Sequence, residues 1–513
     1  MKRLFFLFVL IGLPATVFAQ TEGVRAPSPA LEAARSYRAA HGAEILTAFA
    51  DLLTIPNVGS DSAGIHQNAD YIKAAFEKRG VHIDLLKLPG APPLIYGEIN
   101  TPGATRTLGI YVHYDGQPVD ETRWTHGPWQ PVLYTASMEQ GGQPRPLPPP
   151  GTPVDPEWYL YARSAGDDKA PLGALLPALD ALREAGIALT SNVKFLFEGE
   201  EEMGSPHLAE YLRRYGERYA DVDVWLFCDG PVHQSRRAQL VFGVRGVTGL
   251  EVTVYGATRS LHSGHYGNWA PVPGFLLADL LATMKDETGR VLIDGFYDTV
   301  APLGALEREA LANLPSYDET LRQELGLART EGEGASLAER LLLPSLTVRG
   351  LSSGNVGARA RNIIPASATA ALGIRLVKGN DPQAMIDLVE NHIRKQGFHI
   401  VRDEPDQATR LRYPKIARVR RGGGYPAART PMDLPIAQNV VAAMTDAAGE
   451  PPILVPALGG SLPLYLFTDV LGKPAVIAPI ANHDDNQHAP DENLRLANLW
   501  YGIDLYAALL TMP

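Results

Sequence analysis

The sequence predicts an α/β fold: a mixed, mostly parallel sheet with helices on both faces, and a smaller α+β domain inserted into it. Three observations carry this prediction. Strand and helix signals alternate between residues 107 and 228, the pattern changes at about position 239, and the alternation resumes between 435 and 510. Such alternation is typical of parallel sheets, and an interruption with strand-helix-strand units of its own indicates an insertion.

The first domain is expected to begin with two helices, at 39–53 and 70–80, where apolar residues recur at helical spacing. A hydrophobic run over 107–113 predicts a buried strand. The chain then alternates through helix, strand, helix and strand at 171–185, 193–197, 205–215 and 222–228. Between these parts, the proline-rich stretch over 141–156 cannot hold regular structure and is expected to be a surface loop.

The inserted domain is expected to have strands at 249–255, 345–349 and 368–377 and helices at 273–286 and 382–396. The basic stretch over 418–424 is interpreted as a solvated linker that returns the chain to the first domain. These signals predict a first domain in two pieces, 20–237 and 413–513, with the insertion at 238–412.

The composition is that of an ordinary globular protein. Of the 513 residues, 45% are hydrophobic and 20% are charged, which argues against a disordered or fibrous chain and provides enough apolar material for two domains. The formal net charge is -11, which gives no basic footprint that would attract nucleic acid. We therefore expect no nucleic-acid partner.

The N-terminus predicts a signal peptide over residues 1–19. Its start is cationic, residues 4–13 are apolar, and Val17 and Ala19 stand at the minus-three and minus-one positions of a cleavage site. An uncleaved anchor is the alternative, but the apolar run is shorter than the ~20 residues that span a bilayer. We expect a secreted or periplasmic protein with no membrane contact after cleavage.

Four clusters of acidic or histidine residues, and one further aspartate, follow predicted strands or lie in loops. They are His113-Tyr114-Asp115, Asp167-Asp168-Lys169, Glu200-Glu201-Glu202, Asn486-Gln487-His488 and Asp229. In parallel sheets such residues collect at the carboxyl ends of the strands. Each cluster alone also fits a plain surface, because a histidine at a strand end is often only hydrogen-bonded and a run of glutamates is often only solvated.

Together, these clusters predict a two-metal site. Several carboxylates at one edge of a sheet repel each other unless cations lie among them. Two histidines and three carboxylates balance two divalent ions and one hydroxide, with the ions ~3.5 to 4 Å apart and a water ionised between them. Because Cys228 is the single cysteine, neither an intramolecular disulfide nor a cysteine-based zinc site can form.

Several motifs also follow one another in a specific order. They are His113-Tyr114-Asp115 with Gln117-Pro118, Asp167-Asp168-Lys169, Glu198-Gly199-Glu200-Glu201-Glu202-Met203-Gly204-Ser205, His262-Ser263-Gly264, Gly459-Gly460-Ser461-Leu462-Pro463 and Gln487-His488-Ala489-Pro490-Asp491-Glu492. In this order they resemble the aminoacylase and carnosinase family of metallopeptidases, and most closely its carnosinase-like dipeptidase branch. A set of spaced motifs in one order is far more specific than any single motif.

The resemblance implies a role for each position at the centre. Asp167 would bridge two metal ions, and the other ligands would be His113 and Asp229 on one metal and Glu202 and His488 on the other. Glu201 would be the general base, which takes a proton from the metal-bound water and passes it to the leaving nitrogen. Asp115 would orient the imidazole of His113, and its plainer interpretation is a turn residue.

The resemblance also implies contacts with the substrate. His262 would reach the scissile carbonyl bound to a neighbouring subunit, which requires a homodimer formed through the inserted lid domain. Arg375 would pair with the terminal carboxylate of the substrate, although it also fits a surface salt bridge. Gly460 and Ser461 would offer backbone N–H groups to the same carboxylate.

The chain departs from the family pattern at Gly116, Ala170 and Leu458, and these departures put the shape of the pocket, and therefore the substrate, in question. In the last cluster, His483, Asp484 and Asp485 compete with His488 on chemistry alone. The following Pro490-Asp491-Glu492 motif favours His488.

The resemblance implies hydrolysis of dipeptides or short peptides with a free C-terminal carboxylate. Deacylation of N-acyl amino acids is the nearest alternative, and a non-catalytic secreted binding module is an alternative of a different class. Zinc is the expected metal, and manganese or cobalt remain open because histidine and carboxylate ligands accept all three.

Overall fold

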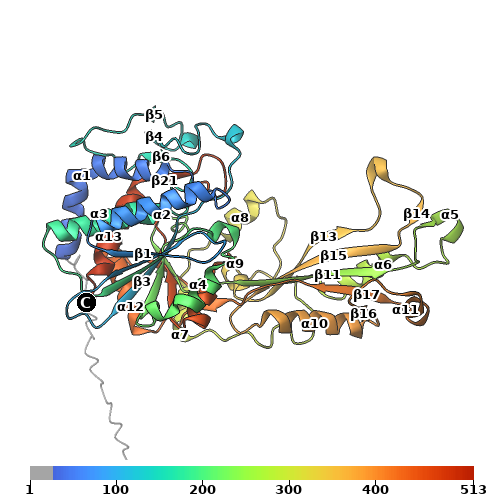
Figure 1. Ribbon diagram of the computed structural model, residues 1–513. Coiled ribbons are helices and arrows are strands. Elements are labelled where there is room, and N and C mark those ends of the chain that lie inside the picture. The colour runs from blue at the N-terminus through green and yellow to red at the C-terminus, as the bar shows by residue number, and fades with distance from the viewer. Residues whose placement is uncertain (1–26) are drawn as a thin grey trace, which may run out of the picture.

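Two domains make up the part of the chain that the computed structural model describes, residues 27–513 (Figure 1). The first contains an eight-stranded sheet between helices, and the second extends from it as an elongated arm built on a five-stranded sheet. The predicted α/β class with a smaller inserted α+β domain is confirmed. The predicted signal peptide lies outside the described residues.

The large sheet is parallel at its centre and antiparallel toward its edges. Its strands, in spatial order, are β1 (His82–Leu86), β2 (Leu94–Ile99), β7 (Asn192–Glu198), β3 (Thr107–His113), β8 (Val224–Phe227), β20 (Ala475–Ile477), β9 (Gln239–Val241) and β19 (Ile453–Val455). The neighbours β7, β3, β8 and β20 are mutually parallel, so their carboxyl ends meet at one edge.

Both faces of this sheet are buried, which explains the continuous apolar run of β3. Ile110 and Val112 pack into a core with helices on one face, whereas Tyr111 packs into a second core on the other face. The first core contains residues of α1 (Pro29–Leu53), α2 (Ser62–Glu77), α3 (Ala170–Glu184), α12 (Pro435–Ala448) and α13 (Leu496–Leu510), and the second contains residues of α4 (Leu208–Tyr215). A strand covered on both faces loses the alternating pattern of a half-exposed one.

The first two helices begin well before the expected positions 39 and 70. The Ser28 side chain accepts a hydrogen bond from the backbone at the start of α1, and Pro29 occupies the first helical turn. The Asp61 side chain does the same for α2 by accepting from the N–H of Gly64. Capping residues and Pro, rather than apolar spacing, set these two starts.

A small sheet lies next to the large one and contains β21 (Asn493–Arg495), β6 (Tyr159–Tyr161), β4 (Val132–Tyr134) and β5 (Pro144–Arg145). The expectation that 141–156 holds no regular structure is therefore wrong at two residues. Pro144 and Arg145 pair with β4 at the outer edge of this sheet, where a proline is tolerated because one side of the strand has no partner.

The second domain has a sheet with helices on one face. Its strands, in spatial order, are β13 (Ser345–Ser352), β15 (Ser367–Leu376), β11 (Gly246–Tyr255), β17 (Ile416–Arg421) and β16 (His399–Val401), and its packed helices are α6 (Pro273–Ala282) and α10 (Pro382–Lys395). At the far end lie β12 (Leu261–His262), α5 (Ser263–Tyr266), β14 (Ile363–Ile364) and α11 (Gln407–Arg412).

The interpretation of 418–424 as a linker is wrong, because β17 pairs with β11 along six residues. Ala417 and Val419 are buried, and the arginines between and beyond them hide this alternation in the sequence. The second domain therefore extends to about residue 421 rather than 412. It also begins later than 238, since β9 belongs to the large sheet. The chain passes between the two domains twice, once in each direction. Strands β10 (Gly243–Val244) and β18 (Ala428–Arg429) lie in these two connecting segments and pair with each other.

Three short helices that the sequence did not predict precede β13: α7 (Ala305–Ala312), α8 (Asp318–Glu324) and α9 (Leu337–Leu341). Figure 1 shows α8 and α9 where the two domains meet. Within residues 27–513, no helix combines the length and the apolar character needed to cross a bilayer.

Candidate metal centre and active site

The candidate site lies at the carboxyl edge of the large sheet. His113 ends β3 and pairs in register with Glu198, the last residue of β7, and Asp229 follows the end of β8. Asp167 lies in the loop before α3, and His488 lies in the long loop between β20 and β21. Parallel strands that end together thus bring residues from distant parts of the chain to one place.

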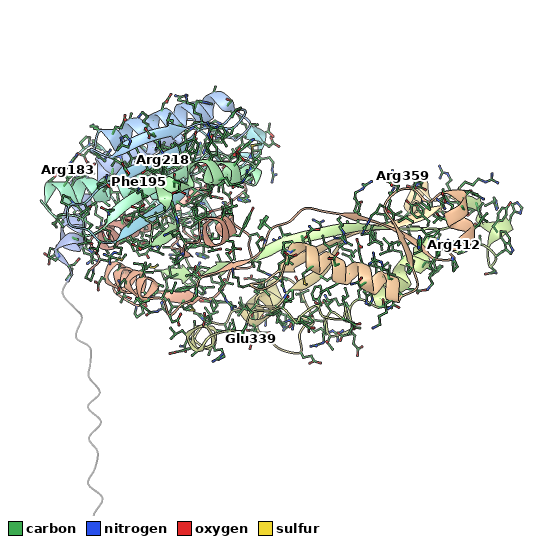
Figure 2. All side chains as sticks on the ribbon, turned by 60° about the horizontal axis from the view of Figure 1, so that its bottom comes forward. Arg183, Phe195, Arg218, Glu339, Arg359 and Arg412 are labelled. Carbon is green, nitrogen blue, oxygen red and sulfur yellow. The ribbon has the colours of Figure 1, made fainter. Side chains whose placement is uncertain are left out.

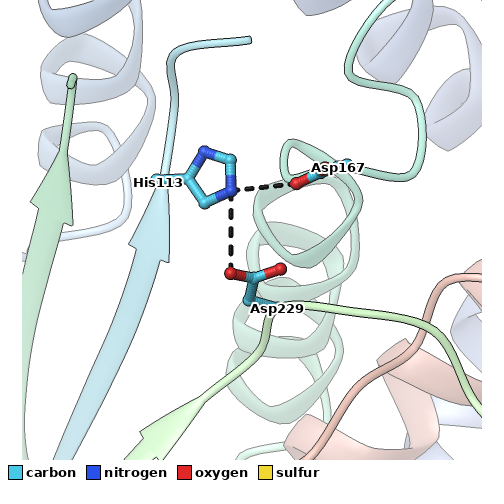
Figure 3. A group of neighbouring side chains, drawn as sticks. All are labelled: His113, Asp167 and Asp229. Carbon is cyan, nitrogen blue, oxygen red and sulfur yellow. Dashed lines mark hydrogen bonds and ion pairs between the residues drawn. The ribbon is translucent and has the colours of Figure 1, made fainter. Parts of the chain in front are cut away.

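Asp167 stands at the centre and contacts both histidines. Its Oδ1 lies 2.9 Å from Nε2 of His113, which is 3.8 Å from Oδ2 of Asp229 (Figure 3). Its Oδ2 lies 3.1 Å from Nε2 of His488, which is 3.4 Å from Oε2 of Glu202. In each of these two groups, the potential ligand atoms all lie within 4.8 Å of one another. One carboxylate therefore belongs to two ligand groups, one oxygen to each.

The donor set fits two divalent cations. Each group offers one imidazole nitrogen and carboxylate oxygens, a combination that zinc, manganese and cobalt all accept. Without cations, these carboxyl groups bind protons more tightly than usual: burial, together with the neighbouring Asp167, raises the pKa of Asp229 to about 6 and that of Glu202 to about 7. Cations would remove this penalty, since the ionised carboxylates would then face positive charge.

The two histidines and Asp167 are held in their charged forms by one another. Burial opposes the charge of His113, but its hydrogen bonds to Asp115 and Asp167 raise its pKa well above the usual value. The contact with Asp167 likewise raises the pKa of His488. Burial opposes the ionisation of Asp167 as well, yet the bonds from both histidines hold its pKa well below the usual range.

Asp115 links the histidine to the glutamates. Its Oδ1 and Oδ2 accept the backbone N–H groups of Glu201 and Glu202, each at 3.0 Å, and its Oδ1 lies 3.4 Å from Nδ1 of His113. The sequence assigned Asp115 to the imidazole alone. The structure shows that its carboxylate also fixes the turn η3 (Glu201–Met203), which carries both glutamates.

The three consecutive glutamates point to two different places. The carboxylate of Glu200 accepts the backbone N–H of His207 at 2.9 Å and contacts its Nδ1 at 2.8 Å, away from the centre. Glu201 and Glu202 line a cavity of about 490 Å³ together with Asp167 and His488. Burial raises the pKa of Glu201 well above its usual value, and the charge of His113 partly opposes this rise.

Several residues that sequence reasoning gave no role hold the centre in place. Glu492 accepts the backbone N–H groups of Gly166 and Asp167 on Oε1, at 3.0 and 2.8 Å, and Oε2 accepts from Ser164 and Arg163. Gln117 donates to Oε2 of Glu202, and Gln487 donates to Oδ2 of Asp167, each at 2.7 Å. Gln117, Gln487 and Glu492 all belong to the motifs quoted above. Their presence in these motifs was the one sequence signal that could have assigned them a role at the site.

The residues predicted to bind substrate are divided between two places. Gly460 and Ser461 line the same cavity as the metal-ligand candidates, and Nη1 of Arg375 donates to Oγ of Ser461 at 2.8 Å. His262 is exposed and lies with β12 and α5 at the far end of the second domain (Figure 1). Within one chain, the structure does not bring His262 to the centre.

Comparison with known proteins agrees with this geometry. A model of the peptidase family M20/M25/M40 matches residues 109–512. The Cys-Gly metallodipeptidase dug1 of Schizosaccharomyces pombe is 26% identical over 479 residues, which cover 90% of this chain and 94% of that protein. The Beta-Ala-His dipeptidase of Homo sapiens is 27% identical over 424 residues, covering 81% of this chain and 76% of that protein.

The fold is similar to that of an M20 family metallo-carboxypeptidase from Sulfolobus solfataricus, with a TM-score of 0.71 and 29% identity, covering 91% of this chain and 98% of that one. The family match covers well over half of the chain. It confirms the resemblance inferred from the order of the motifs, and the chain belongs to peptidase family M20/M25/M40.

Proposed function

We propose that this metallopeptidase hydrolyses the amide bond of dipeptides or short peptides that have a free C-terminal carboxylate, and that zinc is its metal. The observation that carries the proposal is the position of Asp167, whose two carboxylate oxygens face two separate ligand groups. His113 and Asp229 would hold one ion and Glu202 and His488 the other. Two of the similar proteins are named as dipeptidases, which supports the choice of a small peptide.

Two bound cations would supply Lewis-acid charge that polarises the scissile carbonyl and lowers the pKa of a water. Glu201 lines the cavity without belonging to either ligand group, so its carboxylate is free to accept a proton from that water. The same carboxyl would then deliver the proton to the leaving amine nitrogen. Burial raises the pKa of Glu201, which makes its carboxylate a stronger acceptor for the proton of the water.

Recognition of the free carboxylate is proposed for Arg375, Gly460 and Ser461. One guanidinium nitrogen of Arg375 already donates to the hydroxyl of Ser461, and the exposed remainder of the guanidinium offers a fork of further donors. Gly460 and Ser461 lie in the wall of the cavity next to the metal-ligand candidates. A peptide bound between them would place its last amide bond near Glu201.

We further propose a homodimer formed through the second domain. Trp269 and Val356 are 79% and 88% exposed, and Phe275, Val348 and Leu351 are also exposed on this arm, which is unusual for large apolar side chains. Strand β13 is an edge strand with one neighbour, β15. A second copy that covers this surface would bring its own His262 toward the site of the first, where the imidazole could stabilise negative charge on the scissile carbonyl oxygen.

Export is proposed on the N-terminal sequence alone. A cationic start, an apolar run and Ala19 before a cleavage site support a secreted or periplasmic protein. Sequencing the N-terminus of the mature protein from the extracellular or periplasmic fraction tests this: a chain that starts at Gln20 is expected, and a chain that keeps Met1 would contradict it.

The catalytic proposal is tested by comparing release of amino acids from dipeptides with release from N-acetyl amino acids. Dipeptides are expected to be hydrolysed faster, chelation is expected to abolish turnover, and zinc is expected to restore it. Faster hydrolysis of N-acetyl amino acids would establish the deacylase alternative. Turnover that survives complete metal removal would contradict the proposed chemistry. A binding module is the least supported alternative, because Glu201 and four of the ligand candidates line one cavity, and the fifth candidate, His113, contacts Asp167 at 2.9 Å.

A further inference from the structure

A second cavity, of about 480 Å³, lies at the near end of the second domain, between its sheet and the segment that carries α8 and α9. Glu339 of α9, labelled in Figure 2, marks this segment. The cavity shares no lining residue with the active-site cavity, and its volume lies within the ~300 to 1,000 Å³ of ordinary small-molecule sites. It is therefore a separate space that a ligand could fill.

The wall of this cavity is strongly cationic. Five basic side chains line it against two acidic ones, Asp318 and Glu331; the basic ones are Arg245, Lys285, Arg322, Arg329 and Arg340. Lys285 pairs with Glu331 at 2.7 Å, and Arg322 pairs with Glu319 at 2.6 Å. The other three arginines have no ion pair with any residue in 27–513. Such an excess of unpaired positive charge in a cavity favours an anion.

Arg245 is the buried charged group of this site, and hydrogen bonds hold its guanidinium in place. Its residue is only 6% exposed, its Nη2 donates to the carbonyl of Leu343 at 2.7 Å and to Oγ of Ser345 at 3.1 Å, and its Nε is buried with no hydrogen-bond partner among the described residues. Burial, together with the nearby Arg375, lowers the pKa of Arg245 to about 10. A buried guanidinium without a counter-ion is costly, and an anion bound in the cavity would offset that cost.

The rest of the wall is apolar. Leu321 and Leu325 approach from α8 and its end, Leu341 from α9, and Leu346 from β13. We propose that this cavity binds a small amphipathic monocarboxylate, whose charged group pairs with the unpaired arginines and whose hydrocarbon body packs against the leucines. The proposed binding site lies outside the active-site cavity, so binding does not depend on the proposed peptidase reaction, and only the regulatory role described below rests on that reaction.

The cavity is connected to the loop that forms one wall of the active site. The backbone N–H of Arg245 donates to the carbonyl of Gly460 at 3.1 Å. Leu341 lies so close to Gly459 that a Cβ on this glycine would be 3.0 Å from Cδ2 of Leu341. A ligand that orders Arg245 and Leu341 would therefore act on the loop proposed to hold the substrate carboxylate. We expect the ligand to regulate the enzyme by changing the KM for peptides.

Octanoate is a suitable probe, and its binding can be measured by isothermal titration of the metal-loaded protein. A ligand of this size is expected to bind with a Kd of about 0.1 to 1 mM. Arg340→Met removes one unpaired charge, and Leu325→Glu places a negative charge in the wall at a side chain that is 61% exposed, so that folding should be retained. Each change is expected to weaken binding about tenfold. The matched control is Arg412→Met at the far end of the arm (Figure 2), which should leave binding unchanged.

Two further binding experiments distinguish this site from the metal centre. Chelated protein is expected to bind octanoate as well as metal-loaded protein does, and octan-1-ol, which lacks the charge, is expected to bind much more weakly. Absence of octanoate binding, equal binding by Arg340→Met, Leu325→Glu and the control, or loss of binding on chelation would each overturn the site. Binding that leaves the KM for a dipeptide unchanged would overturn the regulatory role.

Discussion

Glu492→Gln is the substitution that most sharply tests how the loop of Asp167 is held. The carboxylate of Glu492 accepts three backbone N–H groups, from Ser164, Gly166 and Asp167, and the guanidinium of Arg163. Both charged side chains are almost fully buried, at 3% and 1% exposure. Glutamine keeps the shape and one acceptor oxygen, but it leaves the buried guanidinium without a counter-ion and part of the backbone donors without a partner.

Removing one partner of a buried ion pair costs about 3 to 5 kcal/mol, so the free energy of unfolding of the metal-free protein should fall by about that amount. Because the loop positions the bridging carboxylate, zinc affinity should also fall by about 10- to 100-fold. Urea denaturation and competitive zinc titration measure the two effects. The matched control is Glu157→Gln, which breaks the more exposed pair with Arg495 and should cost about 0 to 1 kcal/mol. If both variants gave the same stability and zinc affinity, Glu492 would not hold the loop.

Three further outcomes are expected. Because burial raises the pKa of Asp229 to about 6 and of Glu202 to about 7, the folded metal-free protein binds more protons than the unfolded chain between about pH 4 and 7, and its stability should fall as the pH rises through this range. Zinc uptake should release protons, which calorimetry detects as a heat that depends on the buffer. A buffer-independent heat would contradict this. Co-expression of His262→Ala with Glu201→Gln should restore about a quarter of wild-type turnover, since half of the dimers then contain one intact site, whereas no recovery would contradict a shared site. Arg375→Met should lower kcat/KM for dipeptides by about 10- to 100-fold and leave C-terminal amides unaffected, and an equal loss for both substrates would show that Arg375 does not read the carboxylate.

The convergence at the sheet edge could be predicted because strand ends are visible in the sequence. His113 and Asp229 follow apolar runs of strand length, and parallel strands place their carboxyl ends together. The loop residues Asp167 and His488 are different, since nothing local indicates where a long loop folds back. Their assignment came from the order of the motifs, and the structure places both within 3.1 Å of each other.

The supporting contacts could not be predicted, because they join residues that are far apart in the chain. Glu492 lies 325 residues from Asp167, and both of its oxygens are used by backbone donors that carry no side-chain signal. The role of Asp115 was only half visible for the same reason. Its contact with His113 is local, whereas its bonds to Glu201 and Glu202 cross from β3 to the end of β7.

The C-terminal boundary of the second domain was predicted too early in the chain because β17 is rich in arginine. In β17, the buried Ala417 and Val419 alternate with arginines that reach acidic side chains, such as Arg420 with Glu251 and Arg421 with Glu390. The sequence pattern shows three arginines within four residues of this stretch, Arg418, Arg420 and Arg421, and such a pattern indicates a solvated segment. The acidic side chains that neutralise these arginines, and the strand β11 that pairs with β17, lie elsewhere in the sequence, so this stretch alone does not indicate a strand.

Metal analysis of the purified protein tests the central claim most directly, namely that Asp167 joins two cation sites. The wild-type chain should hold about two zinc equivalents, and Glu201→Gln should keep both while losing most turnover. Asp167→Asn should lose metal from both sites, because one oxygen belongs to each group. Two tightly bound equivalents in Asp167→Asn, or loss of metal in Glu201→Gln instead, would contradict the account.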